Sequence, residues 1–398
     1  MMMTVRVRMN CDQGISSGIK IIPVGFDCVN LRKIINMDLQ QRISSFASLG
    51  AMLRAFVTGP AVSRPGPVSV QGWEADLLDA MEASGKDNGW FTRDSMLMAL
   101  SYWGDMLDLT HIETWLARYN PALEKASAAK KVGVIMAGNI PMVGFHDLLT
   151  VLLSGNRLVG RLSSQDQRII PHLVSLLESV DSGWSEFIEL TTREIEKPDA
   201  IIATGSNNTS RYFSYYFSKY PHIIRKNRTG VAVLDGKETT TELEGLALDI
   251  FSYFGLGCRN VSKLYLPEGY DFNPLHEAFL PYQQLFHHQK YRNNLDYYRS
   301  IYLVNRTPIL DGIFYLLVET QQLSSPVSVL HYEYYNDPAQ AEEMISIQKE
   351  QIQCVVSRKG FLRNDLSEPV VLPGRTQLPA LSDYADGVDT MQFLLEKI

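Results

Sequence analysis

One cysteine stands where a reactive thiol would be expected. Cys258 ends the stretch FGLGC, between an amphipathic segment, 241–254, and a short apolar run, 264–266. Gly255 and Gly257 interrupt the helical pattern and allow other groups to approach the backbone closely. A thiol on such a turn is accessible to substrate and lies near backbone N–H donors, as a nucleophile requires. From this stretch alone, a small buried cysteine without a chemical role is an equal alternative.

Other patterns argue against several classes of site. The four cysteines show no CxxC spacing and no flanking histidines, so neither a zinc site nor a disulfide framework is indicated. No predicted strand is followed by GxGxxG, and GxxxxGK[S/T] is absent, so the common Rossmann fingerprint and the P-loop are both missing. His287 and His288 with Asp296 could suggest a metal site or a proton relay. Adjacent histidines point apart on a helix, which favours no functional role.

The composition is that of a globular protein with a large core. The 398 residues are 45% hydrophobic and 20% charged, with a formal net charge of −7. Nucleic acid and anionic membrane surfaces are therefore not expected as partners. No apolar run approaches the roughly 18 residues that a membrane helix needs, and no signal-peptide pattern begins the chain. A reducing, cytoplasmic setting is predicted.

The elements that must position Cys258 begin after a stretch without periodicity. Residues 1–36 are predicted to be a flexible leader, and Met37 is a possible natural start. Asp38 is a plausible N-cap of the first helix, and further helices are expected at 73–83, at 93–107 behind Thr92, and at 112–119 behind a Thr110/Glu113 capping box. A second capping box, Thr241/Glu244, is expected before Cys258. Residues 37–130 are thus predicted to be a helical region.

From Lys131 the pattern alternates between strands and helices, which predicts an α/β fold with largely parallel sheets. The predicted strands are Val132–Met136, Leu158–Arg161, Phe187–Leu190, Ala200–Ala203, Val231–Leu234, Leu264–Leu266, Ile301–Val304, Phe314–Val318, Val327–Leu330 and Cys354–Ser357. The predicted helices between them include Gly144–Leu153, Ile169–Val180, Asn208–Phe217 and Ala339–Gln351.

Five stretches, in order, resemble the aldehyde dehydrogenase superfamily. VGVIMAGNIP (132–141) resembles the strand and PWNFP turn of that family, and SGNRLVGRLSSQD (154–166) resembles its GNxVVxKPS segment. DAIIATGS (199–206) resembles the FTGS turn, FGLGC (254–258) the GQxC nucleophile turn, and SSPVSVL (324–330) the FGPVLxV segment. The resemblance covers roughly residues 131 to 357.

The resemblance implies an aldehyde dehydrogenase-like fold, with a Rossmann-type cofactor domain, an α/β catalytic domain and the N-terminal helical region. Residues 131–235 would form the NADP-binding domain and 236–335 the catalytic domain that carries Cys258. Residues 336–398 would be a C-terminal segment that completes the fold. Members of the family commonly dimerise, so a homodimer is expected.

The departures from the family pattern favour one branch of it. Hydrolytic members carry a general-base glutamate before the cysteine, whereas the corresponding stretch, 225–230, contains no carboxylate. Without that base, a thioester on Cys258 has no built-in means of activating water, which favours the acylating branch. NGWFT (88–92) and LSDYADGVDTMQFL (381–394) resemble LuxC-type fatty acyl-CoA reductases in particular. That subfamily reduces activated long-chain acyl groups to aldehydes with NADPH.

The catalytic residues that the resemblance implies are Cys258, as nucleophile, and Asn139. The Asn139 amide and the Cys258 backbone N–H would stabilise the developing oxyanion. Asn139 before Ile-Pro could also be an ordinary turn residue.

For the cofactor, NADPH, the resemblance implies a pyrophosphate site at Gly205 and Ser206, before the helix that begins near Asn208. Arg161 replaces the usual ribose-binding lysine, and its planar guanidinium, with two parallel N–H donors, suits a 2′-phosphate. Ser163 follows in the same segment, and Gln322 stands where the family has a glutamate before FGPV. An ordinary helix cap at Ser206 and a solvated charge at Arg161 remain open alternatives.

The function expected is an acyl-CoA reductase that forms a fatty aldehyde from an acyl thioester through an acyl-Cys258 intermediate. Two alternatives remain: an aldehyde dehydrogenase that oxidises an aldehyde with NAD(P), and a catalytically silent, acyl-binding scaffold subunit. Leu256 stands where the family has a glutamine, and Gln322 where it has a glutamate. These two replacements motivate the scaffold alternative.

Overall fold

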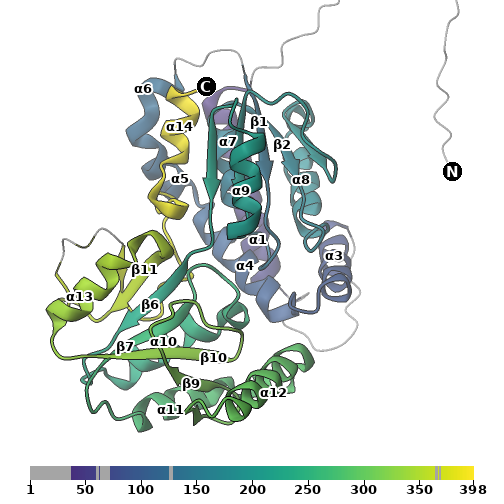
Figure 1. Ribbon diagram of the computed structural model, residues 1–398. Helices are drawn as coiled ribbons and strands as arrows, with labels where there is room; N and C mark the ends of the chain where they lie inside the picture. Colours follow the sequence, from purple (N-terminus) through teal and green to yellow (C-terminus); the bar gives the residue numbers. More distant parts are fainter. Residues whose placement is uncertain (1–36, 60–61, 63–71, 125–128, 364–365, 367–368) are drawn as a thin grey trace, which may run out of the picture. The chain divides into compact units, whose positions relative to one another are not determined.

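The computed structural model describes residues 37–398, except 60–61, 63–71, 125–128, 364–365 and 367–368 (Figure 1). The predicted leader, residues 1–36, lies outside the described residues.

A five-stranded, wholly parallel sheet, here called sheet A, organises the first half of the described chain. Its strands, in spatial order, are β3 (Ile188–Thr191), β2 (Arg157–Arg161), β1 (Lys131–Ile135), β4 (Ala200–Thr204) and β5 (His222–Arg225). The order 3-2-1-4-5 is that of a doubly wound, nucleotide-binding sheet, in which ligands lie at the carboxyl ends of the strands. The expectation of a Rossmann-type half is confirmed.

Sheet B has seven strands and is parallel except for the pairing of β8 with β9. Its spatial order is β12 (Val370–Val371), β11 (Ile352–Ser357), β6 (Thr229–Val233), β7 (Val261–Pro267), β10 (Val329–Tyr335), β9 (Leu316–Glu319) and β8 (Leu310–Asp311). Residues 226–228 connect the two sheets, because β5 ends at Arg225 and β6 begins at Thr229.

The α-helices cover these sheets (Figure 1). They are α1 (Leu39–Thr58), α3 (Trp73–Asp87), α4 (Arg93–Met106), α5 (Leu109–Leu116), α6 (Asn120–Leu123), α7 (Phe145–Leu153), α8 (Ile169–Val180), α9 (Asn207–Tyr216), α10 (Thr240–Phe251), α11 (Asn273–Phe279), α12 (Gln289–Val304), α13 (Pro338–Ile347) and α14 (Thr390–Glu396). No helix among the described residues is long and apolar enough to cross a membrane.

Three apolar cores hold most of these layers together. The N-terminal helices share one core with α7, α8 and one face of sheet A, to which Val132, Val134 and Ile202 contribute. Alternation along β7 separates the other two cores. Leu264 and Leu266 face α10 and α11, whereas Tyr265 faces α13.

One predicted strand is wrong. Ile301–Val304 is the last turn of α12, not a strand. A four-residue apolar run does not distinguish the two structures by itself. Here Leu295, Tyr298 and Tyr302 recur at helical spacing and pack against Leu316 and Val318 of sheet B, which makes the segment helical.

Two predicted capping boxes are also wrong, although both helices exist. The helix before Cys258 begins at Thr240, and its capping box is Thr239 with Glu242. The helix at Ile112 begins earlier, at Leu109, with Asp108 as its N-cap. The caps at Asp38 and Thr92 are confirmed.

Candidate active site

Cys258 follows a strained turn at the end of α10. Tyr253, Phe254 and Gly255 have consecutive φ angles of 51°, 59° and 75°. Two aromatic residues in the left-handed region cost roughly 1–3 kcal/mol each, a strain that is characteristic of functional sites. The turn ends the helix abruptly and sends the chain through Cys258 into β7, which begins at Val261.

The buried side chain of Asn260 holds this turn in shape. Its Oδ1 accepts a hydrogen bond from the Gly257 N–H (2.8 Å). Its Nδ2 donates to the carbonyl oxygens of Asp249 and Ser252, each at 2.9 Å. Because one amide bridges the helix end and the residue before Cys258, Asn260 fixes the position of the nucleophile relative to α10.

Cys258 itself is exposed, although the protein around it is dense. Burial by surrounding atoms raises the pKa of its thiol, and nearby Asp386 raises it further, while Arg259 and Arg225 act in the opposite direction. The net pKa is above the usual value for cysteine, so the thiol is the main form at neutral pH. Nucleophilic attack therefore needs a group or a bound substrate that draws the proton away.

Asn139 reaches the cysteine turn from the end of β1. Its Nδ2 donates to the carbonyl oxygen of Leu256 at 2.7 Å, two residues before Cys258. Asp166, on the loop after β2, holds the GNIP turn by accepting the Met142 N–H at 3.1 Å. Burial raises the pKa of Asp166 to about 6. The structure thus brings Asn139 and the Cys258 turn together.

Arg225, the first residue of the stretch 225–230 that contains no carboxylate, is a buried cation. Arg225 donates to Asp147 Oδ2 (2.5 Å) and to Thr390 Oγ1 (2.9 Å). Both the guanidinium and the Asp147 carboxylate are buried, so the pair is shielded from solvent. The charge of Arg225 lowers the pKa of Cys258, which is the opposite of what a carboxylate there would do.

The carboxylate that does act on Cys258 comes from the C-terminal segment. Asp386, with a φ of 60°, pairs with the Arg228 Nε at 3.4 Å. Burial raises its pKa, and the cations Arg228 and Arg225 oppose that shift. The stretch 381–394, which resembles LuxC-type reductases, therefore contributes directly to the surroundings of the thiol.

The N-terminal stretch that carries the same resemblance also lies at this site. The Trp90 ring is 5.2 Å from the ring of Phe254, on the strained turn, and 5.2 Å from that of His288. His288 accepts the Tyr291 N–H at the start of α12, and its other ring nitrogen lies 2.8 Å from the Gly89 carbonyl. These contacts make His288 a helix cap and a packing residue.

The predicted cofactor residues of β2 lie beside the end of β1. Arg161 ends β2, and its carbonyl accepts the Met136 N–H at 3.0 Å. A Cβ atom on Gly138 would lie 2.5 Å from Ser163 Oγ, so only glycine allows this close approach. Arg161, Ser163 and Asn139 therefore share one edge of sheet A.

Gly205 and Ser206 follow β4, the neighbour of β1 on the other side. Ser206 is the N-cap of α9 and accepts the Thr209 N–H at 3.2 Å. A Cβ atom on Gly205 would lie 3.0–3.2 Å from Phe213 and Thr209. The cap reading of Ser206 is confirmed, and it is compatible with phosphate binding, because the free N–H groups of a capped helix end attract anions.

The residues at this edge fit a nicotinamide dinucleotide. The carboxyl ends of β2, β1 and β4 are adjacent and present one arginine, a helix N-terminus and glycine-lined backbone. Arg161 would hold a ribose phosphate, and the start of α9 would hold the pyrophosphate.

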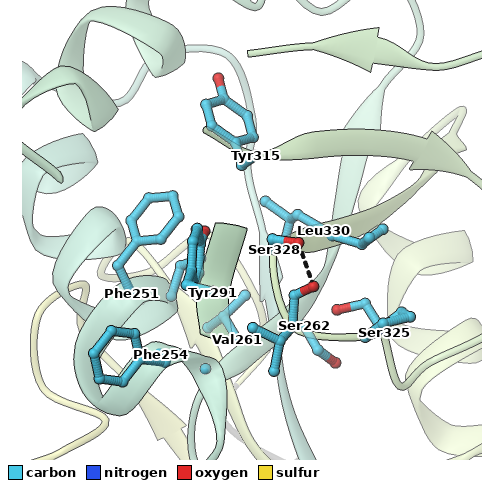
Figure 2. A pocket seen from close by; sticks show the side chains of 14 residues that line it. Phe251, Phe254, Val261, Ser262, Tyr291, Tyr315, Ser325, Ser328 and Leu330 are labelled. Atoms are coloured by element: carbon cyan, nitrogen blue, oxygen red, sulfur yellow. Dashed lines mark hydrogen bonds between the residues drawn. The ribbon is translucent and has the colours of Figure 1, made fainter. Parts of the chain in front are cut away.

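Gln322 is not in contact with the other predicted residues. It lies exposed in the β9–β10 loop. Its backbone carbonyl oxygen is 3.0 Å from Nδ1 of His331. Further along this loop, residues 325–330 line a narrow pocket of about 30 Å³ beside Phe254. Figure 2 shows Phe251, Phe254 and Tyr291 on one side of it and the serines of the loop on the other. As it stands, the pocket has room for about one water molecule.

Comparisons with known proteins support this architecture. Residues 90–278 match the model of the acyl-CoA reductase (LuxC) family. No curated protein matches the sequence.

Among solved structures, the putative aldehyde dehydrogenase PutA from Anabaena variabilis is 13% identical, with a TM-score of 0.56 over 86% of this chain and 85% of that one. Aldehyde dehydrogenase 21 from Physcomitrella patens, in complex with succinate, is 11% identical, with a TM-score of 0.54 over 90% and 88%. GapN from Methanocaldococcus jannaschii, a glyceraldehyde-3-phosphate dehydrogenase complexed with NADP, is 12% identical, with a TM-score of 0.52 over 90% and 92%. The predicted aldehyde dehydrogenase-like fold is confirmed.

Proposed function

We infer that this chain, whose residues 90–278 belong to the LuxC family of acyl-CoA reductases, reduces an acyl thioester to an aldehyde with NADPH. The family and the fold make it an enzyme of the acyl-CoA reductase and aldehyde dehydrogenase kind. The observation that carries the finer proposal is the Cys258 turn, with Asn139 beside it and Arg225 in place of a carboxylate.

In the first step, the sulfur of Cys258 attacks the thioester carbonyl carbon. The carbonyl oxygen becomes an oxyanion, which the Cys258 N–H and the Asn139 amide stabilise. One amide hydrogen of Asn139 is directed to Leu256, and the second remains available as a donor. The carbon–sulfur bond to the donor then breaks, and the donor leaves as a thiolate that takes up a proton.

Asp386 is the group we propose to handle that proton. It raises the pKa of Cys258, and burial raises the pKa of Asp386 itself, which favours the uptake of a proton by this carboxylate. Its ion pair with Arg228 keeps it in place.

The acyl group on Cys258 is the form in which the substrate is reduced. A bound nicotinamide cofactor supplies the hydride. Asn139 and the Cys258 N–H again hold the oxygen, and the bond to the Cys258 sulfur breaks as the aldehyde forms. Arg225 favours the thiolate that leaves, because a cation near sulfur lowers the pKa of the thiol.

For the cofactor, we propose NADPH over NADH. Arg161 would bind the 2′-phosphate, with Ser163 beside it and Gly205 and Ser206 at the pyrophosphate. Gln322, on the β9–β10 loop, is proposed to contact the cofactor from sheet B.

The test is NADPH consumption with saturated acyl-CoAs of increasing chain length. We expect NADPH-dependent aldehyde formation, with slower turnover on NADH, and a higher kcat/KM for long chains than for acetyl-CoA. Longer chains bury more apolar surface, at roughly 0.8 kcal/mol per buried CH₂. The aldehyde is measured directly by trapping as a hydrazone.

The matched control is the reverse assay, with aldehyde and NADP⁺ but without any thiol acceptor. Rapid, thiol-independent formation of carboxylic acid would contradict the proposal and favour an ordinary aldehyde dehydrogenase. Cofactor binding without turnover on any acyl thioester would also contradict it.

A further inference from the structure

A second cavity, larger than the one beside Phe254, opens where the two sheets are connected. Its volume is about 460 Å³, within the range of small-molecule sites. Its walls come from α9, the 226–228 connection, the residues before β11 and the C-terminal segment. We refer to it as the junction pocket.

The junction pocket contains two cationic side chains without an acidic partner. A third cation, Arg228, lines the pocket but is paired with Asp386 (3.4 Å) and lies near Glu350 (4.0 Å). Arg211 and Lys226 are exposed and line the pocket, and neither forms an ion pair with any residue in the described part of the chain. In a chain with a net charge of −7, this local excess of positive charge indicates an anionic ligand.

The pocket lies within reach of Cys258. The strands β11, β6 and β7 are neighbours in sheet B, so their amino ends are adjacent, at about 4.8 Å per strand. The pocket residues Arg228 and Glu350 precede β6 and β11, and Cys258 precedes β7. A direct contact crosses these strands, because Cys354 Sγ lies 3.8 Å from the Arg259 carbonyl.

The junction pocket is separate from the predicted cofactor edge. Arg161 and Ser163 follow β2, three strands away from β5, which the pocket adjoins. Ser206, proposed for the pyrophosphate, caps α9, and the pocket begins four residues further along, at Ser210. Phe213 packs α9 onto sheet A in the same cluster as Ile224 of β5. The residues proposed for the cofactor and the residues that line the pocket therefore share no member, although both sets include part of the first turns of α9 or its cap.

We propose that the junction pocket binds the phosphopantetheine arm of the acyl donor, with its phosphate between Arg211 and Lys226 and its sulfur directed toward Cys258. This assignment rests on the proposed function for the identity of the reacting thioester. Coenzyme A and acyl carrier proteins share this arm, and its phosphate is the group that charge-assisted hydrogen bonds from Arg and Lys recognise best. The Arg228–Asp386 pair lines the same pocket, and Asp386 is close enough to Cys258 to raise the pKa of its thiol, so the pair can exchange a proton with the departing sulfur.

The test is calorimetric titration with desulfo-coenzyme A, which lacks the reactive sulfur and so binds without reaction. The wild-type protein should bind it, and the R211A/K226A variant should bind at least about tenfold more weakly, as expected for the loss of hydrogen bonds to a charged group. Lys219→Ala, which removes a cation just beyond the far end of α9, is the matched control and should bind like the wild type. NADPH affinity should be the same in all three proteins.

A second arm identifies the source of the phosphate. Phosphopantetheine that binds as tightly as desulfo-coenzyme A would place recognition on the shared arm and make an acyl carrier protein a competent donor. Binding of desulfo-coenzyme A alone would assign recognition to its nucleotide phosphates and overturn the placement of the arm. A loss of NADPH affinity in R211A/K226A, or unchanged binding of desulfo-coenzyme A, would also overturn it.

The outcome is independent of the reaction itself. If no acyl thioester is reduced but R211A/K226A still binds desulfo-coenzyme A more weakly than the wild type, the pocket assignment stands and the proposed reaction fails. If reduction occurs, we compare kcat/KM for an acyl-CoA with kcat/KM for the phosphate-free acyl-N-acetylcysteamine. In R211A/K226A this ratio should fall by the same factor as the affinity for desulfo-coenzyme A.

Discussion

Cys258→Ala is expected to abolish both the acyl-enzyme and the production of aldehyde. The alanine variant has no sulfur to attack the thioester, and activity should fall below detection. The fold should persist, because Cys258 is exposed and is not among the buried core residues. Mass spectrometry after mixing with acyl-CoA should show the acyl mass on the wild-type protein and none on the variant.

Cys354→Ala is the matched control. Cys354 is a buried thiol beside the same turn, and burial raises its pKa to about 12, so it is a poor nucleophile. Its loss should leave the acyl adduct and turnover close to wild type. An adduct that persists in Cys258→Ala, or that disappears in Cys354→Ala, would mean that the nucleophile has been misassigned.

Asn139→Ala is expected to lower kcat by roughly 10²–10³, the usual loss for one oxyanion donor. Asn139 lies in an exposed turn and donates a hydrogen bond to the Leu256 carbonyl, so its amide already contacts the turn that carries Cys258. The melting temperature should change little, because the contact is on the surface. Steady-state kinetics and a thermal melt together measure both effects.

A purely structural role for Asn139 would give a different result. If the amide only anchored the cysteine turn, its loss would move Cys258 and change the rate at which iodoacetamide alkylates it. We expect the alkylation rate to remain within about twofold of wild type while kcat falls. Wild-type kcat in Asn139→Ala, or equal losses of alkylation and turnover, would rule out the oxyanion role.

The regular elements could be predicted where the hydrophobic pattern is long. The predicted helix at 169–180 coincides with α8, since its apolar residues recur at helical spacing along its whole length. The short edge strands and β5 (His222–Arg225) were not predicted, because two to four residues carry too little pattern. The strand predicted at Ile301–Val304 is wrong for the same reason, because only the packing of this segment against β9 makes it helical.

The site was predictable in part. The motif around Cys258 and the GNIP turn are local signals, and the structure brings Asn139 to that turn. Asn260 and Asp386 were missed, because their importance depends on which strands and loops are neighbours in space. Asn260 acts through three backbone groups around the helix end, and Asp386 comes from the far end of the chain. The left-handed Phe254 was also unpredictable, because glycine is the residue usually found in that conformation.

The absence of a carboxylate from 225–230 gives the account its sharpest consequence. Glu242 is engaged in the capping box of α10, and Asp386, which the mechanism assigns to the proton of the departing sulfur, is held by Arg228. We expect Asp386 to exchange protons with sulfur and not to activate water, so an acyl-Cys258 meets no general base of the hydrolytic kind. The acyl group should wait on the sulfur until the cofactor arrives.

The most direct test of this claim is a rapid-mixing measurement of coenzyme A release from acyl-CoA without NADPH. The account predicts a burst of about one equivalent per active site that then almost stops, and a restart with aldehyde formation when NADPH is added. Continuous release of coenzyme A with accumulating free fatty acid, in the absence of NADPH, would contradict it. In that case a carboxylate activates water, Asp386 would be the first to replace, and the enzyme would be a thioesterase rather than a reductase.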